Sequence, residues 1–259
     1  MQLIRFLRPI DLQERMYATY ISLRIGLGLL AFALPLVLVG WGYFVEHIPA
    51  QGSMSAYYFA FEPITSELRQ FPMRGWFVGT LFAVGCFLYL YKGFSRTENI
   101  VLNIAGLSAV AVALFPMRMP EYCKNCGSDT FHFVHGFAAV TLFVCMAYVA
   151  WACIDETLVE LEESKRNWFR SRYFLLAAAM LLAPIAAVAL TFSLGINHWL
   201  VLIVEGLGIW TFAAYWLLKS YELSLSKADQ KAMKGQRLSV SEAAAEKRSL
   251  RKRAARLLD

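Results

Sequence analysis

Several signatures of soluble enzymes are missing from this chain of 259 residues. It has neither a glycine-rich loop that would cradle phosphates nor a dinucleotide-binding fingerprint, which argues against nucleotide-dependent enzymes. It has no glycine-flanked serine elbow, so a nucleophilic serine has little support. Its apolar stretches do not alternate with a period of two residues, which argues against a membrane β-barrel. Charged residues make up only 17% of the chain and hydrophobic residues 58%, as in integral membrane proteins.

Long apolar stretches are what the chain has in abundance. A hydrocarbon core about 30 Å thick needs roughly 20 mostly apolar residues in helical form. The segments that meet this requirement are residues 19–44, 75–94, 99–117, 131–153, 173–194 and 196–218. The sequence therefore predicts an all-α, polytopic membrane protein, a bundle of six transmembrane helices. No small-residue cleavage site follows the first span, so we expect it to be retained.

The placement of lysine and arginine predicts how the bundle is oriented. Cytoplasmic loops carry an excess of these residues. If both termini are cytoplasmic, the outer loops hold only Arg69, Arg74, Arg118 and Lys124 of the 25 lysines and arginines. We therefore predict a protein of the cell's inner membrane with both termini cytoplasmic. The net charge of +6 is then a topogenic signal, and we expect no nucleic-acid partner.

The same pattern divides the chain into three parts. Residues 1–18 are predicted to be a cytoplasmic N-terminal segment, and residues 19–219 the transmembrane domain. Within that domain, the outer loop 45–74 is long enough to form a structured element. Residues 220–259 are predicted to be a basic cytoplasmic helical tail that contacts anionic lipid headgroups. A protein partner for this tail, or a homo-oligomer, is an open alternative.

One cluster carries metal-ligand residue types. Cys123 and Cys126 are separated by two residues and are followed by His132 and His135. Two thiolates and two imidazoles form a familiar zinc ligand set. The spacer between Cys126 and His132 is shorter than in ordinary zinc fingers, and the outer side of a membrane is commonly oxidising. A zinc site, a disulfide between Cys123 and Cys126, and neither of these remain alternatives.

Two ionisable residues fall inside predicted spans, where such groups need partners. His135 lies about one turn inside the fourth span, and Glu205 lies near the middle of the sixth. His135, His198 and Arg74, in the same half of the bundle, are candidate partners of Glu205. For both residues, a functional site and a purely structural hydrogen bond between helices are the alternatives. We expect the two side chains to face one common hollow.

Other residues within the spans are assigned structural roles. Arg24 is expected to snorkel or to pair with Glu98. Small residues in the first three spans suit the close approach of helices in lipid. These small residues are Gly26, Gly28, Gly79, Gly85, Ala105 and Gly106.

A third cluster lies in and beside the first outer loop. It comprises Ser53, Ser55, Tyr57, Tyr58 and Arg74. Two hydroxyls, two phenols and a guanidinium at the level of the headgroups suit a phosphate or a lipid head. An aromatic belt with polar neighbours is the alternative.

A resemblance to a known family rests on motifs spread over residues 19–219. The motifs are Ser53-Met-Ser-Ala-Tyr-Tyr58, Arg74-Gly-Trp-Phe-Val-Gly79, Tyr91-Lys-Gly93, Asn103-Ile-Ala-Gly106, Ala113-Leu-Phe-Pro116, His135, Glu205 through Trp210, Trp216 and Lys219. In these the chain resembles a bacterial six-helix membrane family of unknown function, similar in layout to the DRAM/Frag-like membrane proteins. The resemblance implies a serine-bearing outer loop after the first span and specifies no activity.

The sequence leaves three functional hypotheses. The first is a multi-pass protein with an outer-facing polar pocket for a lipid headgroup or a small solute. The pocket residues would be Ser53, Ser55, Tyr57, Tyr58, Arg74, His135, His198, Glu205 and Trp210. The second is a metal-dependent membrane hydrolase with His132, His135 and His198 as ligands. The third is a proton-coupled transporter with Glu205 as its proton site. Whether the protein is an enzyme stays open.

Overall fold

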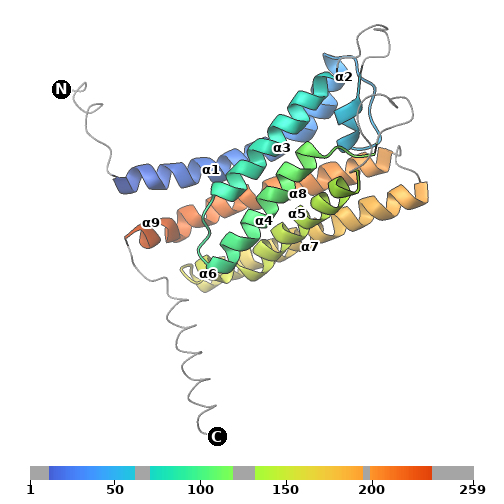
Figure 1. Ribbon diagram of the computed structural model, residues 1–259. Helices are drawn as coiled ribbons and strands as arrows, with labels where there is room; N and C mark the ends of the chain where they lie inside the picture. The colour runs from blue at the N-terminus through green and yellow to red at the C-terminus, as the bar shows by residue number, and fades with distance from the viewer. Residues whose placement is uncertain (1–11, 62–70, 119–131, 195–198, 235–259) are drawn as a thin grey trace, which may run out of the picture.

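The computed structural model describes residues 12–61, 71–118, 132–194 and 199–234. Within these ranges all regular secondary structure is helical, which confirms the predicted all-α fold. Long helices lie side by side in an elongated bundle (Figure 1). The elements are α1 (Leu12–Pro35), the π-helix η2 (Leu36–Trp41), α2 (Gly42–Phe44), the 3₁₀-helix η3 (Ser55–Phe59), α3 (Pro72–Leu90), α4 (Arg96–Leu114), α5 (His132–Ala152), α6 (Asp155–Leu158), α7 (Glu163–Leu194), α8 (Trp199–Ser226) and α9 (Ala228–Met233).

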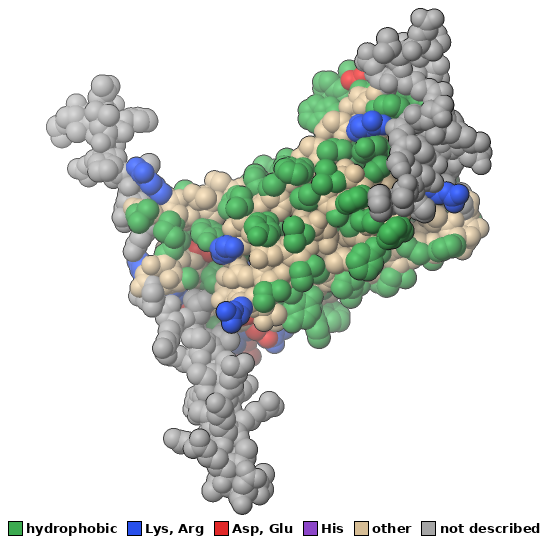
Figure 2. Space-filling view, in the orientation of Figure 1, with side chains coloured by type: hydrophobic (Ala, Val, Ile, Leu, Met, Phe, Trp, Pro, Cys, Tyr) green, Lys and Arg blue, Asp and Glu red, His purple; other side chains and the backbone are tan. Residues whose placement is uncertain are grey.

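Six helical segments of the described chain are long and apolar enough to cross a membrane, as predicted. They are Glu14–Phe44, Pro72–Leu90, Arg96–Leu114, Phe133–Leu158, Glu163–Leu194 and Trp199–Ser226. Several extend beyond the predicted spans because polar residues also continue a helix. Hydrophobic side chains cover the middle of the face in Figure 2, whereas lysines and arginines lie near its ends.

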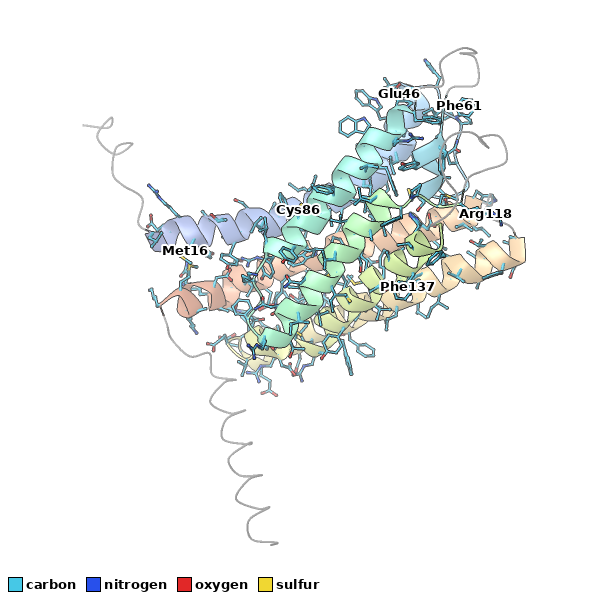
Figure 3. All side chains as sticks on the ribbon, in the orientation of Figure 1. Met16, Glu46, Phe61, Cys86, Arg118 and Phe137 are labelled. Carbon is cyan, nitrogen blue, oxygen red and sulfur yellow. The ribbon has the colours of Figure 1, made fainter. Side chains whose placement is uncertain are left out.

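The six long helices form a closed ring. Each of α1, α3, α4, α5 and α7 contacts the next long helix along the chain, and α8 returns to contact α1. The 3₁₀-helix η3 packs against α3 at one end of this ring. We call it the η3 end; Glu46, Phe61 and Arg118 lie there, with Met16 at the opposite end (Figure 3).

Glycines allow α3 and α4 to approach each other closely. A Cβ atom on Gly85 would lie 2.7 Å from the carbonyl oxygen of Gly106, and one on Gly106 would lie 2.7 Å from that of Gly85. Gly28 likewise faces the side chain of Leu217. Around Gly79 nothing lies within 4 Å of such an atom, so the predicted close approach is wrong there.

A buried ion pair joins α1 and α9, the first and last helices of the described residues, opposite the η3 end. Arg24 on α1 is fully buried, and its Nη2 lies 2.5 Å from Oδ2 of Asp229 on α9. The predicted Arg24–Glu98 pair is therefore wrong. Glu98 instead accepts a hydrogen bond from the backbone N–H of Phe94, at 2.7 Å. The chain reverses at Lys227, whose φ is 53°, and this turn brings Asp229 back to α1.

A second buried charge cluster lies at the same end. Lys219 Nζ donates to Glu222 Oε2 at 2.7 Å and to Thr157 Oγ1 at 2.6 Å. The hydroxyl of Tyr173 donates to the same Glu222 oxygen at 3.0 Å. These bonds join α6, α7 and α8, so this end is held together by paired polar groups.

We predict that Gly85→Ala destabilises the protein by about 1–3 kcal/mol, because the added methyl group meets backbone and α3 must move away from α4. Gly79→Ala is the matched control on the same helix, and we expect it to be neutral or slightly stabilising. Thermal unfolding of both purified variants in detergent measures the difference. Equal unfolding temperatures for the two variants would contradict the close packing of α3 on α4.

We predict that Asp229→Ala destabilises the protein by about 3–5 kcal/mol, because it leaves a buried guanidinium without its counter-charge. The double variant Arg24→Met with Asp229→Leu removes both charges and should recover most of this loss. Thermal unfolding of the full chain in detergent measures both. A double variant as unstable as Asp229→Ala would show that the pair is not the source of the effect.

Candidate functional site

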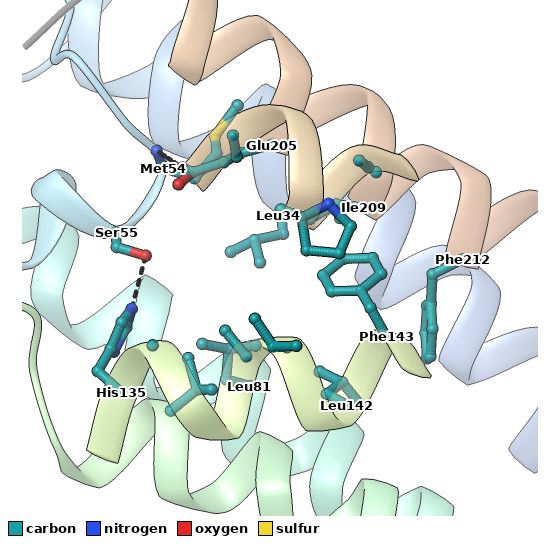
Figure 4. A pocket seen from close by; sticks show the side chains of 18 of the residues that line it. Leu34, Met54, Ser55, Leu81, His135, Leu142, Phe143, Glu205, Ile209 and Phe212 are labelled. Atoms are coloured by element: carbon teal, nitrogen blue, oxygen red, sulfur yellow. Dashed lines mark hydrogen bonds between the residues drawn. The ribbon is translucent and has the colours of Figure 1, made fainter. Parts of the chain in front are cut away.

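A cavity of about 210 Å³ lies inside the helical ring toward the η3 end. Its walls are mostly apolar and come from all six long helices. They include Leu34, Leu81, Val112, Leu142, Ile209 and Phe212. The polar side chains on the cavity are Ser55, His135 and Glu205, which come from η3, α5 and α8 (Figure 4). The structure thus places the two ionisable residues of the fourth and sixth spans on one hollow.

His135 bridges two parts of the chain through its ring nitrogens. Its Nδ1 lies 2.9 Å from the carbonyl oxygen of Phe115, and its Nε2 lies 2.9 Å from Ser55 Oγ. A carbonyl oxygen can only accept a hydrogen bond, so Nδ1 carries the proton. In the singly protonated ring Nε2 is then an acceptor, and the Ser55 hydroxyl donates to it.

Glu205 holds the start of η3. Its Oε2 accepts a hydrogen bond from the backbone N–H of Met54 at 2.6 Å. A Cβ atom on Gly206 would lie 2.8 Å from Met54 Cε. The glycine therefore lets η3 approach α8 closely enough for this contact.

Ser53 and Tyr57 support η3 rather than line the cavity. Ser53 Oγ accepts a hydrogen bond from the backbone N–H of Ala56 at 3.1 Å. Tyr57 is almost fully buried, and its hydroxyl accepts from the backbone N–H of Gln51 at 3.5 Å. Burial raises the pKa of the Tyr57 phenol. Both residues fix the conformation of the segment that presents Ser55.

Arg74 and Tyr58 also stabilise this segment. Arg74 Nε donates to the carbonyl oxygen of Tyr58 at 3.1 Å. Its guanidinium carbon lies 4.4 Å from the ring centre of Tyr58 and 4.2 Å from that of Phe71, within the range of cation–π attraction. Arg74 therefore fastens α3 to η3, and it is not part of the cavity lining.

Trp210 lies outside the cavity lining as well. Its Nε1 donates to the backbone carbonyl of Phe32 at 3.1 Å, and its ring stacks on that of Phe32 at 6.1 Å between centres. Phe32 lies just before Pro35, where α1 gives way to the π-helix. Such irregularities free backbone groups, which neighbouring helices then bond. The contact gives Trp210 a structural role, because it joins α8 to α1.

The remaining predicted site residues lie outside the described residues. They are Cys123, Cys126 and His198, together with the side chain of His132. In the described part of the chain no group of three His, Cys, Asp or Glu side chains is arranged to hold a metal ion. His135 has both ring nitrogens in hydrogen bonds, so it offers no free lone pair. The zinc site and the Cys123–Cys126 disulfide stay predictions.

The fold and the cavity define a multi-pass helical membrane protein whose internal hollow is bordered by η3. A family described as "Protein of unknown function (DUF998)" matches residues 50–217, and the chain belongs to this family. The match includes η3, α5 and most of α8, which carry Ser55, His135 and Glu205. Comparison with curated proteins and with solved structures gives no match.

Sequence reasoning missed the backbone groups of this site. The N–H of Met54 and the carbonyl of Phe115 are the partners of Glu205 and His135. Every residue has the same backbone groups, so the sequence does not show which of them bond to these side chains. It shows only that each buried polar side chain needs a partner. The pairing of Ser55 with His135, across 80 positions, also had no local signal.

We predict that Glu205→Ala loosens the start of η3, because the buried N–H of Met54 loses its acceptor. Such a loss is worth about 1–3 kcal/mol, or roughly a 5- to 150-fold faster local hydrogen exchange. Glu205→Gln keeps an acceptor oxygen and should stay near wild type. Hydrogen exchange of peptides covering residues 50–60 measures this. Thr211→Val, on α8 but outside the cavity lining, is the control; unchanged exchange in Glu205→Ala would contradict the contact.

Proposed function

We propose that this protein binds an amphiphilic membrane lipid, with one acyl chain in the cavity and the polar end at η3. The observation that supports the proposal is the distribution of polarity in the cavity. Its walls are apolar, and its polar side chains Ser55, His135 and Glu205 lie toward η3. Apolar cavities of about 150 Å³ stay dry and take up apolar ligands.

The size of the cavity favours a single chain. Pockets for drug-sized ligands measure about 300–1,000 Å³, and this one measures about 210 Å³. It is too small for a whole phospholipid but suits part of one acyl chain. The sequence predicts a polar pocket for a headgroup or small solute; because most of the lining is apolar, we instead place an acyl chain in the cavity.

The position of α7 supports entry from the bilayer. Pro184, Ala187 and Val188 of α7 form part of the cavity wall. Only 17% of the most apolar stretch of α7 is buried, so this helix is largely exposed to lipid. A chain that enters beside α7 would pass from the hydrocarbon core directly into the cavity.

The orientation and location belong to the same proposal. We infer an inner-membrane protein with cytoplasmic termini, because lysines and arginines concentrate at the end opposite η3. The η3 end then faces away from the cytoplasm, and the basic C-terminal tail contacts anionic headgroups. We also propose that this protein is similar in layout to the DRAM/Frag-like membrane proteins.

Photocrosslinking tests the proposal with a phosphatidylcholine that carries a diazirine near the end of one acyl chain. In nanodiscs containing this lipid, we expect crosslinks to peptides of α5 and α8 that line the cavity. Ala187→Phe fills the cavity and should reduce these crosslinks about fivefold or more. Ala189→Phe, on the exposed face of the same helix, is the matched control. Equal crosslinking of the cavity peptides in both variants would contradict the proposal.

A further inference from the structure

We infer that Ser55 is a nucleophile for acyl transfer, with His135 as its general base and the ester of an acyl lipid as substrate. The inference rests on the proposed function, because the substrate's acyl chain would occupy the cavity. It adds a reaction that lipid binding alone does not require.

The two side chains have the geometry of a nucleophile and its base. A general base must lie about 2.6–3.2 Å from the group whose proton it takes. Ser55 Oγ and His135 Nε2 are 2.9 Å apart. Both residues line the cavity, so the pair faces the space where the acyl chain would lie (Figure 4).

A third group orients the base, as nucleophilic catalysis requires. The carbonyl oxygen of Phe115 accepts from Nδ1–H of His135 at 2.9 Å. This bond fixes both the plane of the ring and its tautomer, which leaves the lone pair of Nε2 directed at the serine. In serine hydrolases a carboxylate fills this role, whereas here a backbone carbonyl does.

The surrounding residues single out Ser55 as the reactive hydroxyl. Ser53, two positions earlier, is 3% exposed and its oxygen accepts from the backbone of Ala56. Ser55 is half-buried and faces His135. Glu205 is a positioning residue, since it binds the N–H of Met54, the residue before Ser55, and so fixes where the serine lies.

The reaction balances with water as the only co-reactant. Ser55 Oγ forms a bond to the ester carbonyl carbon while its proton moves to His135 Nε2. The tetrahedral intermediate collapses, the C–O bond to the alcohol breaks, and the alcohol leaves with the proton from His135. Water then attacks the acyl-serine, with His135 again taking and returning a proton, and the fatty acid is released.

Serine-directed probes test the inference on the purified full chain in detergent. Two fluorophosphonates are used, one with a hexadecyl chain and one with a methyl group. We expect a single phosphonyl adduct on Ser55 by intact mass and peptide mapping, formed faster with the hexadecyl probe. Ser55→Ala should abolish it, and His135→Gln should slow it by about 10²- to 10⁴-fold. Ser220→Ala is the control. Ser220 lies near the end of α8 that is far from Glu205, and this variant should label like wild type.

The outcomes separate this inference from lipid binding. No adduct on Ser55 of the wild-type protein with either probe would overturn the inference, whatever the variants do, while photocrosslinking still decides the proposed function. Labelling of Ser55 at equal rates by both probes would support the serine–histidine pair and contradict the acyl-chain site. Hydrolysis of 4-nitrophenyl octanoate that disappears in Ser55→Ala would support turnover, and hydrolysis that persists in this variant would count against it.

Discussion

Polar groups buried among membrane-spanning helices must find hydrogen-bond partners within the protein, and this constraint shapes the η3 end. His135 and Glu205 project from two different helices into a largely apolar interior. The segment around Ser55 supplies partners to both, through the Ser55 hydroxyl and the backbone N–H of Met54. The short 3₁₀-helix η3 is thereby fixed over the end of the bundle, and the cavity beneath it acquires a polar end.

The two ends of the molecule meet this constraint in different ways. Opposite η3, side chains of opposite charge pair with one another, as Arg24 does with Asp229 and Lys219 with Glu222. At the η3 end, the polar side chains bond to backbone and to a hydroxyl, and they leave an apolar hollow between the helices. The first arrangement closes the bundle, whereas the second leaves a cavity between the helices.

Much of the architecture was predictable because hydropathy is a local property. The six spans and the all-α fold follow from runs of apolar residues. His135 and Glu205 are identifiable from the sequence because an ionisable side chain within a membrane span needs a partner and marks a candidate functional site. Their partners did not stand out, since these depend on how distant segments meet. For the same reason the sequence does not reveal that Trp210 bonds to α1 rather than lining the pocket, or that Arg24 pairs with Asp229 rather than with Glu98.

The state of the His135 ring tests the account most directly, since the roles of Ser55, Phe115 and the cavity all depend on it. The chain has 4 histidines, so ¹⁵N-histidine labelling with His135→Gln as the assignment control resolves its two ring nitrogens by NMR. The account predicts the tautomer with the proton on Nδ1. A proton on Nε2 instead would mean that the ring donates to Ser55, and the proposed base would not exist.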